Sequence, residues 1–236
     1  MSTIPSRVEN IKDILDNINN QTLKPNKIFL NIPYKYKRFS NQIINDEDLK
    51  KIKIENLIIR RCEDYGPGTK IMGSINEIRN FDCVILLDDD HLYDKNICEL
   101  FLNEFQKKQI NYSFYLNKIF NIKMGQCADG FLMNTKLLDK IESFYAKYVK
   151  NNKNMFLDDD LWLAIYLQKE KKSSIKNLIY MYREKFGKHV VYTQNSNSKK
   201  DGLHLTAHKD GLFLNRRKIQ KIEYMKYLIK SLFIKI

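Results

Sequence analysis

Apolar positions along the chain follow two spacings, one typical of a helical face and one typical of a β-strand. Residues 8–18 place apolar side chains three and four positions apart after a capping box at residues 6–9, which predicts a first helix to about residue 20. Residues 27–32 place apolar side chains at alternate positions, which predicts a strand. The remaining predictions are strands at 57–61, 83–87, 112–120 and 175–181, and helices at 69–80, 95–108, 135–150, 158–171 and 215–236.

This order of elements is typical of an α/β protein. Strands and helices alternate in βαβ fashion, which predicts a three-layer α/β/α fold with a mixed, mostly parallel central sheet. The sequence has 236 residues and 43% hydrophobic content, enough for one sizeable core, and it contains no linker, repeat or low-complexity tract. We therefore expect a single domain over residues 1–236.

Composition narrows the class of protein further. The four cysteines have no CxxC spacing, and Cys83 and Cys98 fall on predicted apolar faces, so reduced core thiols are expected instead of a zinc site or disulfides. No stretch reaches the roughly 18 apolar residues of a membrane span. The amino terminus carries Arg7 and Glu9 where a signal peptide has its apolar core, so we expect a cytoplasmic protein.

The formal net charge of +13 favours an anionic partner: nucleic acid, an anionic membrane or a phosphate-bearing substrate. The lysines are spread along the whole chain and no recognition module is visible, so we do not expect nucleic-acid binding. The predicted helix at 215–236 is apolar on one side and basic elsewhere. Peripheral contact with an anionic membrane and ordinary packing of a terminal helix both fit it. The oligomeric state stays open.

Two clusters of aspartates are the candidate chemistry. Asp88–Asp90 end the apolar run that starts at Cys83, and carboxylates at the end of a buried strand can hold a divalent cation beside a nucleotide. A solvated acidic turn fits the same residues. Asp158–Asp160 precede an apolar helical pattern, so they occupy a helix amino terminus, where acidic residues are also common as caps.

A succession of short motifs adds a resemblance. In chain order they are Thr3-Ile4-Pro5-Ser6-Arg7, residues 21–28, Ile32-Pro33, residues 65–70, Leu87-Asp88-Asp89-Asp90, Asp129-Gly130 and residues 158–162. This order resembles the A-type glycosyltransferase fold, specifically the family 2-like group, over about two thirds of the chain. The resemblance implies an inverting, metal-dependent transferase that moves a sugar from a nucleotide-diphosphate sugar, most simply a UDP-sugar, to a hydroxyl of a glycan or protein-linked acceptor.

The resemblance also divides the chain into regions and assigns the donor site. Residues 1–92 would form the nucleotide-sugar-binding half, residues 93–210 the acceptor-binding half, and residues 211–236 a basic terminal helix. For the donor, it implies that Thr3, Pro5 and Arg7 line the base and phosphate side of the nucleotide site. It also implies that Asp64 accepts a hydrogen bond from the uracil imide and that Lys70 approaches the diphosphate. Asp88 and Asp89 would lie beside the bound nucleotide.

The metal implied by the resemblance is Mn²⁺ or Mg²⁺, with Asp90 as the main ligand and Asp88 near the ribose or the metal. Family members often complete the metal shell with a histidine near the carboxyl end. Here that would be His204, or His208 four residues later; a surface histidine in a polar loop also fits both.

The general base and the acceptor loop are implied in the same way. The family's base is the second member of an acidic pair, which matches Asp160, with Asp159 as the second choice. Asp129 and Gly130 match the acceptor loop. Trp162 either stacks against a sugar face or belongs to the core.

One departure from the family concerns the start of the sheet. There a hydrophobic strand precedes the segment that matches residues 3–7, whereas here only Met1 and Ser2 precede it. We expect that the true start lies upstream, that the neighbouring strands close the gap, or that another chain supplies the strand. Two alternative functions also stay open: a catalytically impaired sugar-nucleotide or glycan-binding module, and a metal-dependent nuclease or nucleotidyltransferase.

Overall fold

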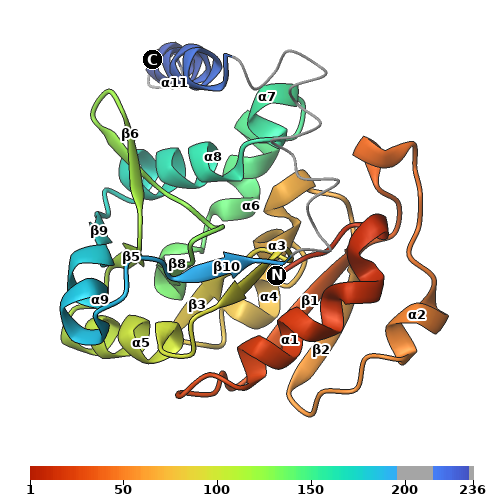
Figure 1. The fold of residues 1–236 in the computed structure, drawn as a ribbon. Helices are drawn as coiled ribbons and strands as arrows, with labels where there is room; N and C mark the ends of the chain where they lie inside the picture. The colour runs from red at the N-terminus through yellow and green to blue at the C-terminus, as the bar shows by residue number, and fades with distance from the viewer. Residues whose placement is uncertain (196–214, 234–236) are drawn as a thin grey trace.

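The computed structural model describes residues 1–195 and 215–233 (Figure 1). The protein has a mixed α/β fold whose strands form several small sheets. Strand β1 (Ile28–Pro33) pairs in parallel with β2 (Leu57–Cys62). A four-stranded sheet has the order β3 (Cys83–Leu86), β8 (Phe131–Asn134), β5 (Asn111–Ser113) and β9 (Ile175–Asn177). Two antiparallel pairs complete the strands: β6 (Leu116–Ile119) with β7 (Ile122–Gly125), and β4 (His91–Tyr93) with β10 (Tyr192–Gln194).

Helices surround these sheets. The α-helices are α1 (Ile11–Asn19), α2 (Asp46–Lys50), α3 (Thr69–Met72), α4 (Ile75–Ile78), α5 (Ile97–Lys107), α6 (Ile141–Phe144), α7 (Lys153–Phe156), α8 (Asp159–Ile165), α9 (Ile179–Phe186) and α11 (Arg216–Phe233). Short 3-10 turns are η1 (Pro5–Asn10), η2 (Lys37–Phe39), η3 (Gly66–Gly68) and η4 (Thr135–Leu137), and α6 and α8 continue into the π-helical turns η5 (Tyr145–Val149) and η6 (Tyr166–Glu170). Among the described residues, no helix is both long and apolar enough to cross a membrane.

The predicted single, mostly parallel sheet is not found among the described residues. β3 pairs with β8 in antiparallel fashion, and β8 pairs with β5 in the same way, so only β5 and β9 are neighbouring parallel strands in that sheet. Strand β8 was missed because all four of its residues are buried. A short apolar run without alternation fits a segment of a buried helix as well as a buried strand.

Several predicted boundaries were also wrong for local reasons. The capping box predicted at residues 6–9 does not form, because η1 already starts at Pro5 and proline is well suited to a first helical position. The helix predicted at 69–80 breaks between α3 and α4, and a side chain at Gly73 would lie 2.6 Å from Asn31 Cβ. The strand predicted at 175–181 is only β9, since helix α9 begins at Ile179.

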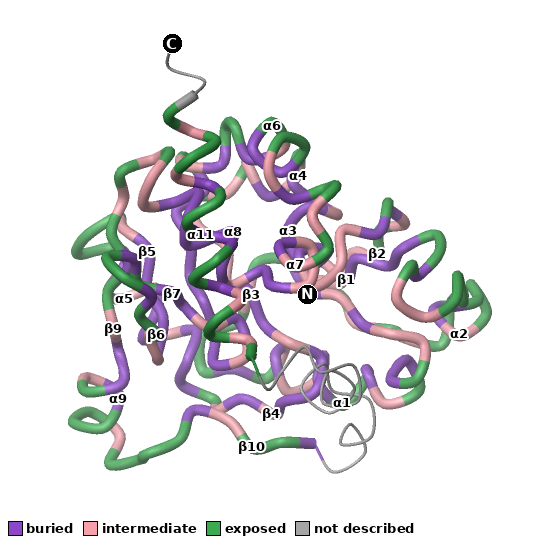
Figure 2. The backbone as a smooth tube through the Cα atoms, turned by 90° about the horizontal axis from the view of Figure 1, so that it is seen from above, coloured by how far each residue is buried: buried purple, intermediate pink, exposed green. Residues whose placement is uncertain are grey.

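The amino terminus lies between β1 and β3 in both Figure 1 and Figure 2. Its residues pair with β1: Asn31 N donates to Met1 O at 2.9 Å, and the Met1 amino group donates to Phe29 O at 2.8 Å. A cavity of about 390 Å³ separates the rest of β1 from β3. The expectation that the neighbouring strands close the gap is therefore wrong.

Candidate functional site

An acidic pocket brings the two aspartate clusters together. It is a cavity of about 470 Å³ formed at the ends of β2 and β3, the turn before α3, the loop before β8 and the start of α8. Its charged lining residues are Arg7, Arg38, Asp64, Lys70, Asp88, Asp89, Asp90, His91, Asp159, Asp160 and Arg216. Residues from opposite ends of the chain therefore meet in one cavity.

Asp89 and Asp90 are held by the segment that follows the amino terminus. Asp89 accepts hydrogen bonds from Thr3 Oγ1 at 2.7 Å and from Arg7 Nη1 at 2.5 Å, yet burial still raises its pKa. Asp90 Oδ2 lies 3.2 Å from Arg7 Nη1, and Asp90 Oδ1 lies 2.8 Å from His91 Nδ1. Burial opposes the charge on Asp90, but His91 and Arg7 outweigh it and lower the pKa of this carboxyl group.

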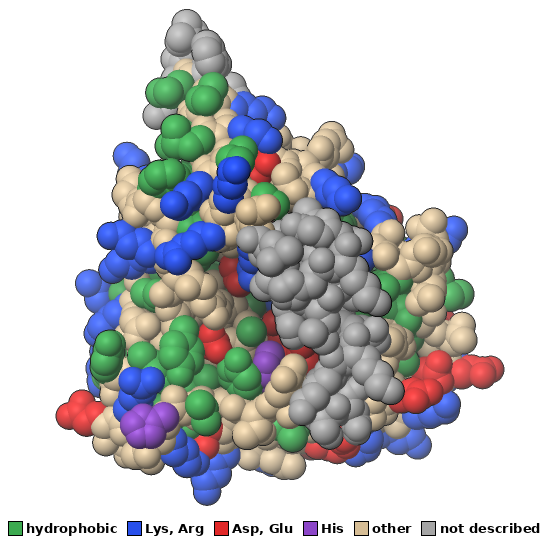
Figure 3. All heavy atoms as spheres, turned by 45° about the horizontal axis from the view of Figure 1, so that its top comes forward, with side chains coloured by type: hydrophobic (Ala, Val, Ile, Leu, Met, Phe, Trp, Pro, Cys, Tyr) green, Lys and Arg blue, Asp and Glu red, His purple; other side chains and the backbone are tan. Residues whose placement is uncertain are grey.

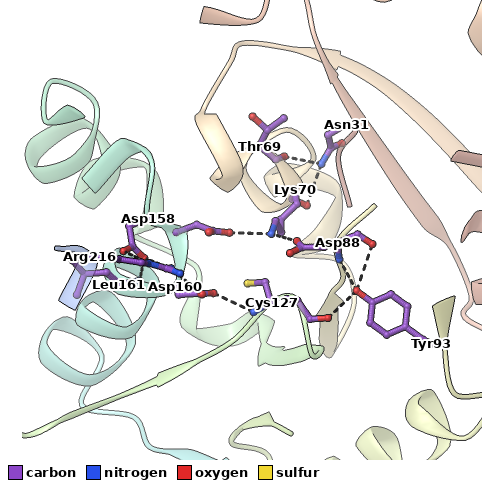
Figure 4. Close-up of polar contacts among 12 residues, drawn as sticks. Asn31, Thr69, Lys70, Asp88, Tyr93, Cys127, Asp158, Asp160, Leu161 and Arg216 are labelled. Carbon is purple, nitrogen blue, oxygen red and sulfur yellow. Dashed lines mark hydrogen bonds and ion pairs between the residues drawn. The ribbon is translucent and has the colours of Figure 1, made fainter. Parts of the chain in front are cut away.

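Lys70 connects the first cluster to the second. Its side chain is buried, its ammonium forms an ion pair with Asp88, and it lies 3.1 Å from Asp159 Oδ2. These two carboxylates outweigh the effect of burial and raise the pKa of Lys70 well above its ordinary value. Asn31 Nδ2 donates to the carbonyls of Thr69 and Lys70 at 3.0 and 3.2 Å, which fixes the turn that carries the lysine (Figure 4).

The members of the second cluster have different surroundings. Asp158 is the N-cap of α8: it accepts from Leu161 N at 3.2 Å, and Arg216 and Gln220 of α11 also donate to it, at 3.0–3.1 Å and 2.7 Å. This confirms the expected helix amino terminus. Asp160 Oδ1 accepts from Cys127 N at 3.1 Å, and its Oδ2 lies 3.5 Å from Arg216 Nη2.

The surroundings of Asp160 strongly alter the ionisation of its carboxyl group. Burial, and then repulsion by Asp159, raise its pKa from 3.8 to about 7, while Arg216 and Lys70 act in the opposite direction. Near pH 7 the group is therefore partly protonated and partly ionised. A carboxylate with this property can take up a proton from a hydroxyl group at neutral pH.

The predicted acceptor loop lies beside the acidic pocket. Asp129 is buried, hydrogen-bonds Tyr192, and has a pKa raised to about 6 because burial outweighs the nearby charge of His91. Asp129 and Tyr192 also line a side cavity of about 390 Å³ together with Tyr115 and Gln126. Gly130 has φ +94°, and a side chain there would lie 3.0 Å from the Phe101 ring, so its conformation and surroundings require glycine.

Most predicted site residues come together, and a few do not. The acidic pocket is lined by Thr3, Arg7, Asp64, Lys70, Asp88, Asp89, Asp90, Asp159 and Asp160. Pro5 starts η1 and is not part of this lining. Trp162 is fully buried and packs edge-on against Tyr145 at 5.6 Å, so its ring cannot stack on a sugar in this structure. His204 and His208 lie outside the described residues.

Asp64 keeps acceptor capacity while it holds the local backbone. Its Oδ2 accepts from Lys37 N at 2.7 Å and its Oδ1 from Gly66 N at 2.8 Å. Each carboxylate oxygen has more than one lone pair, so these bonds leave room for a hydrogen bond from a ligand.

Some residues of the site had no recognisable sequence signal. Arg216 belongs to a helix rich in basic residues, and in the sequence it looks like any solvent-exposed arginine. Its ion pair with Asp158 could therefore not be predicted. The Tyr93 hydroxyl accepts from Asp88 N at 2.8 Å and donates to Ala128 O at 3.1 Å, joining two loops of the pocket (Figure 4). Asn31 had a weak signal, because it interrupts an otherwise apolar strand.

A second set of potential metal ligands lies in the same pocket. The ligand atoms of Cys127, Asp159 and Asp160 all lie within 4.8 Å of one another. Burial raises the pKa of the Cys127 thiol well above its ordinary value, so this sulfur is poorly suited to bind a cation as thiolate.

No protein-family model matches this chain, and no curated protein matches it. Its function must therefore be argued from the acidic pocket itself.

Proposed function

We propose that this protein is an inverting, metal-dependent glycosyltransferase of the A-type fold, family 2-like group. The donor would be a nucleotide-diphosphate sugar, with UDP as the preferred nucleotide, and the acceptor a hydroxyl group of a glycan or protein-linked glycan. One observation carries the proposal: Asp88–Asp90 and the pair Asp159 and Asp160, from different elements, meet in one cavity of about 470 Å³. This volume is in the usual range for a small-molecule site.

The cations of the pocket suit a diphosphate. Arg7 and Lys70 line the cavity from one side and Arg216 from the α11 side. Each forms an ion pair with an aspartate, so an incoming diphosphate would compete with the aspartates for these cations. Arginine and lysine are the side chains that proteins most often use to bind phosphate groups.

Asp88 and Asp90 are the residues that would hold the divalent cation. Their carboxylate oxygens are hard ligands of the kind that Mg²⁺ and Mn²⁺ prefer, and Asp88 remains partly exposed to the cavity. When bound, the cation would neutralise charge that develops on the leaving diphosphate. The Cys127 group is less suitable, since burial raises the pKa of its thiol and disfavours the thiolate that a cation would need.

Asp160 would act as the general base. The acceptor oxygen bonds to the anomeric carbon as the bond from that carbon to the diphosphate breaks, so the leaving diphosphate takes the electron pair. The hydroxyl proton passes to the Asp160 carboxylate. Attack from the face opposite the diphosphate inverts the anomeric centre. The Cys127 N–H holds one oxygen of Asp160, which orients the carboxylate.

The side cavity beside Asp129 is the proposed acceptor subsite. It is lined by the hydroxyl-bearing Tyr115 and Tyr192, the amide of Gln126 and the Asp129 carboxyl group. Such groups can hydrogen-bond the several hydroxyls of a sugar. On this basis we assign residues 1–92 to the donor half and residues 93–195, the described part of the region predicted at 93–210, to the acceptor half.

Calorimetric titration tests the donor site first. UDP, GDP, dTDP and their sugars are titrated with and without Mn²⁺ into the protein, Asp90→Ala and the control Asp82→Ala, in which an exposed aspartate at the other end of β3 is removed. We expect Mn²⁺-dependent binding of one nucleotide class, lost in Asp90→Ala and kept in Asp82→Ala. Absence of nucleotide binding by folded protein would overturn the proposal.

Product analysis separates the alternative functions. A transferase releases nucleoside diphosphate from its donor, with slow transfer to water when no acceptor is present, whereas a nuclease or nucleotidyltransferase would release mononucleotides or pyrophosphate. Donor binding without release of nucleoside diphosphate, across a panel of glycan acceptors, would instead indicate a binding module.

A further inference from the structure

A basic cavity lies between α11 and the segment that joins α6 to α8, at the end of the molecule drawn at the top of Figure 1. Its volume is about 240 Å³, and the ring of Tyr148 forms part of its wall. Its charged lining residues are Lys147, Glu223, Lys226 and Lys230. We call this cavity the lysine cavity.

Glu223 does not neutralise the lysine cavity, because its carboxylate already has its partners. The buried side chain accepts hydrogen bonds from Asn152 Nδ2 at 2.6 Å and from Asn154 Nδ2 at 2.9 Å. Lys226 Nζ donates to it at 2.9 Å. Burial raises the pKa of Glu223, but these three donors outweigh burial and lower the pKa, so the group is ionised at neutral pH. Glu223 therefore balances Lys226 and leaves the other two lysines.

Lys147 and Lys230 bring the remaining positive charges to one aromatic ring. Their ammonium nitrogens lie 5.0 and 5.2 Å from the centroid of the Tyr148 ring. Lys230 Nζ also donates to the carbonyl of Lys147 at 2.8 Å, which holds the lysine against η5. In the part of the chain that the structure describes, neither ammonium forms an ion pair with a carboxylate. Two like charges near one ring repel each other, and an anion in the cavity would compensate both.

An apolar row of α11 borders the lysine cavity. Met225 and Ile229 are exposed, and each stands one position before a lysine of the cavity, Lys226 or Lys230. The apolar row and the lysine row therefore run side by side along the helix. A soluble phosphate needs only the lysines, whereas an anionic lipid offers a phosphate to the lysines and an acyl-chain boundary to the apolar row. The neighbouring rows favour a lipid as the occupant.

We propose that the lysine cavity binds the phosphate group of an anionic membrane lipid. Lys147 and Lys230 would donate charge-assisted hydrogen bonds to the phosphate oxygens, since each ammonium has three N–H donors. Met225 and Ile229 would enter the boundary between headgroups and acyl chains. The lipid would thus occupy a defined site on the protein and not only its diffuse positive field.

Helix α7 joins the lysine cavity to the acidic pocket. Asn152 is the N-cap of α7: its Oδ1 accepts from Asn154 N at 3.1 Å and from Met155 N at 3.2 Å, and the residue also lines the lysine cavity. Phe156, at the other end of α7, lines the acidic pocket. A lipid in the lysine cavity would therefore hold the acidic pocket close to the membrane surface.

Four versions of the full chain test the site. They are the parent, Lys147→Met/Lys230→Met, the charge-keeping Lys147→Arg/Lys230→Arg, and the control Lys169→Met/Lys221→Met. The control removes the same charge from η6 and α11, and its two lysines also lie over aromatic rings, at 5.6 and 5.8 Å, but outside the lysine cavity. Binding to vesicles that contain phosphatidylglycerol is measured by sedimentation, and thermal unfolding shows that each variant is folded.

Lys147→Met/Lys230→Met should weaken vesicle binding about 30-fold, because both charges that would contact the phosphate are removed. Lys147→Arg/Lys230→Arg keeps the charges and should bind within about threefold of the parent. Lys169→Met/Lys221→Met should also bind within about threefold of the parent. Equal weakening by the two methionine variants would show that only the overall charge matters, which would overturn the proposal. Unchanged binding by Lys147→Met/Lys230→Met would overturn it as well.

A soluble phosphate ester separates a lipid from a free ligand. Glycerol 3-phosphate carries a phosphate group without acyl chains, and it is titrated calorimetrically into the parent and into Lys147→Met/Lys230→Met. The difference between the two titrations isolates the lysine cavity from the acidic pocket. We expect glycerol 3-phosphate to bind the cavity at least about 100-fold more weakly than the vesicles do, because the apolar row adds to lipid binding only. Equal affinity would assign the cavity to a soluble phosphate ester and overturn the lipid proposal.

Discussion

The Lys70 ammonium lies 3.1 Å from Asp159 Oδ2 and also forms an ion pair with Asp88, so one buried cation connects the two aspartate clusters. Without the Lys70 ammonium, the negative charges of Asp88 and Asp159 would lose their shared positive partner. Removing one partner of a buried ion pair commonly costs about 3–5 kcal/mol. We expect Lys70→Met to lower the free energy of unfolding by about 3 kcal/mol in a urea titration.

Lys12→Met is the matched control for this variant. Lys12 also pairs with an aspartate, Asp16, but its side chain is half exposed. Exposed pairs contribute about 0–1 kcal/mol, so this variant should unfold almost as the parent does. Equal stability of the two variants would show that Lys70 does not connect the clusters energetically.

Asp160→Asn should separate catalysis from stability. A pKa of about 7 means that the Asp160 carboxyl group is half protonated near neutral pH. If it is the base, kcat/KM of the parent protein should fall about tenfold for each pH unit below 7 and level off above it. Asp160→Asn should lower kcat by about 10²- to 10⁴-fold, whereas Asp139→Asn, at a surface aspartate, should not.

The same substitution should stabilise the fold at high pH. The pKa of Asp160 is raised in the folded protein, so the fold favours the protonated form, and stability is lost as pH rises through about 7. Asparagine removes this loss. Asp160→Asn should therefore unfold at higher urea than the parent at pH 8, by roughly 1–4 kcal/mol, with the gain vanishing below about pH 4. A gain that is constant with pH would contradict the pKa shift.

Arg216 tests the same carboxyl group from the opposite side. Its guanidinium binds Asp158 and lies 3.5 Å from Asp160, and its charge lowers the pKa of Asp160. Arg216→Met should move the rising limb of the pH–kcat/KM profile to higher pH, and Arg216→Lys should restore part of the shift. Arg217→Met changes an exposed neighbour and should leave the profile in place. An unchanged profile in Arg216→Met would exclude Asp160 as the titrating base.

The sequence predicted the position of β1, β2, β3 and α5 because their apolar patterns are long or sharply bounded. The resemblance placed Asp64, after β2, and Asp88–Asp90, after β3, at one donor site, and these residues line the same pocket in the structure. Trp162 could not be assigned in this way. Its position on the helix is compatible with a ring in the core and with a ring that stacks on a ligand. Only the packing of the ring against Tyr145 and close to Gly68 shows that it belongs to the core.

The interaction between α11 and the rest of the protein was equally hidden. Sequence spacing showed an amphipathic helix but not which side would pack. In the structure, Tyr224 and Tyr227 are buried against the body of the protein, and Arg216 reaches Asp158. Long-range pairs of this kind depend on how distant segments meet, which no local pattern in the sequence contains.

The opposite side of α11 leads to a last prediction. Its exposed apolar side chains are Ile222, Met225, Ile229 and Leu232, and lysines stand beside them along the helix. Figure 3 shows apolar and basic side chains together on this projecting part of the molecule. Basic residues near an anionic lipid surface contribute about 1 kcal/mol each, and apolar side chains can enter the boundary between headgroups and acyl chains.

We therefore expect the protein to sediment with vesicles that contain phosphatidylglycerol, but not with pure phosphatidylcholine vesicles. The double variant Met225→Ser/Ile229→Ser should weaken this binding about tenfold, since it removes two apolar side chains that would enter the lipid but no charge. Tyr180→Ser/Val190→Ser removes two exposed apolar side chains from other elements and should bind as the parent does. Equal binding by both double variants would mean that charge alone draws the protein to the membrane and that the apolar side of α11 stays in water.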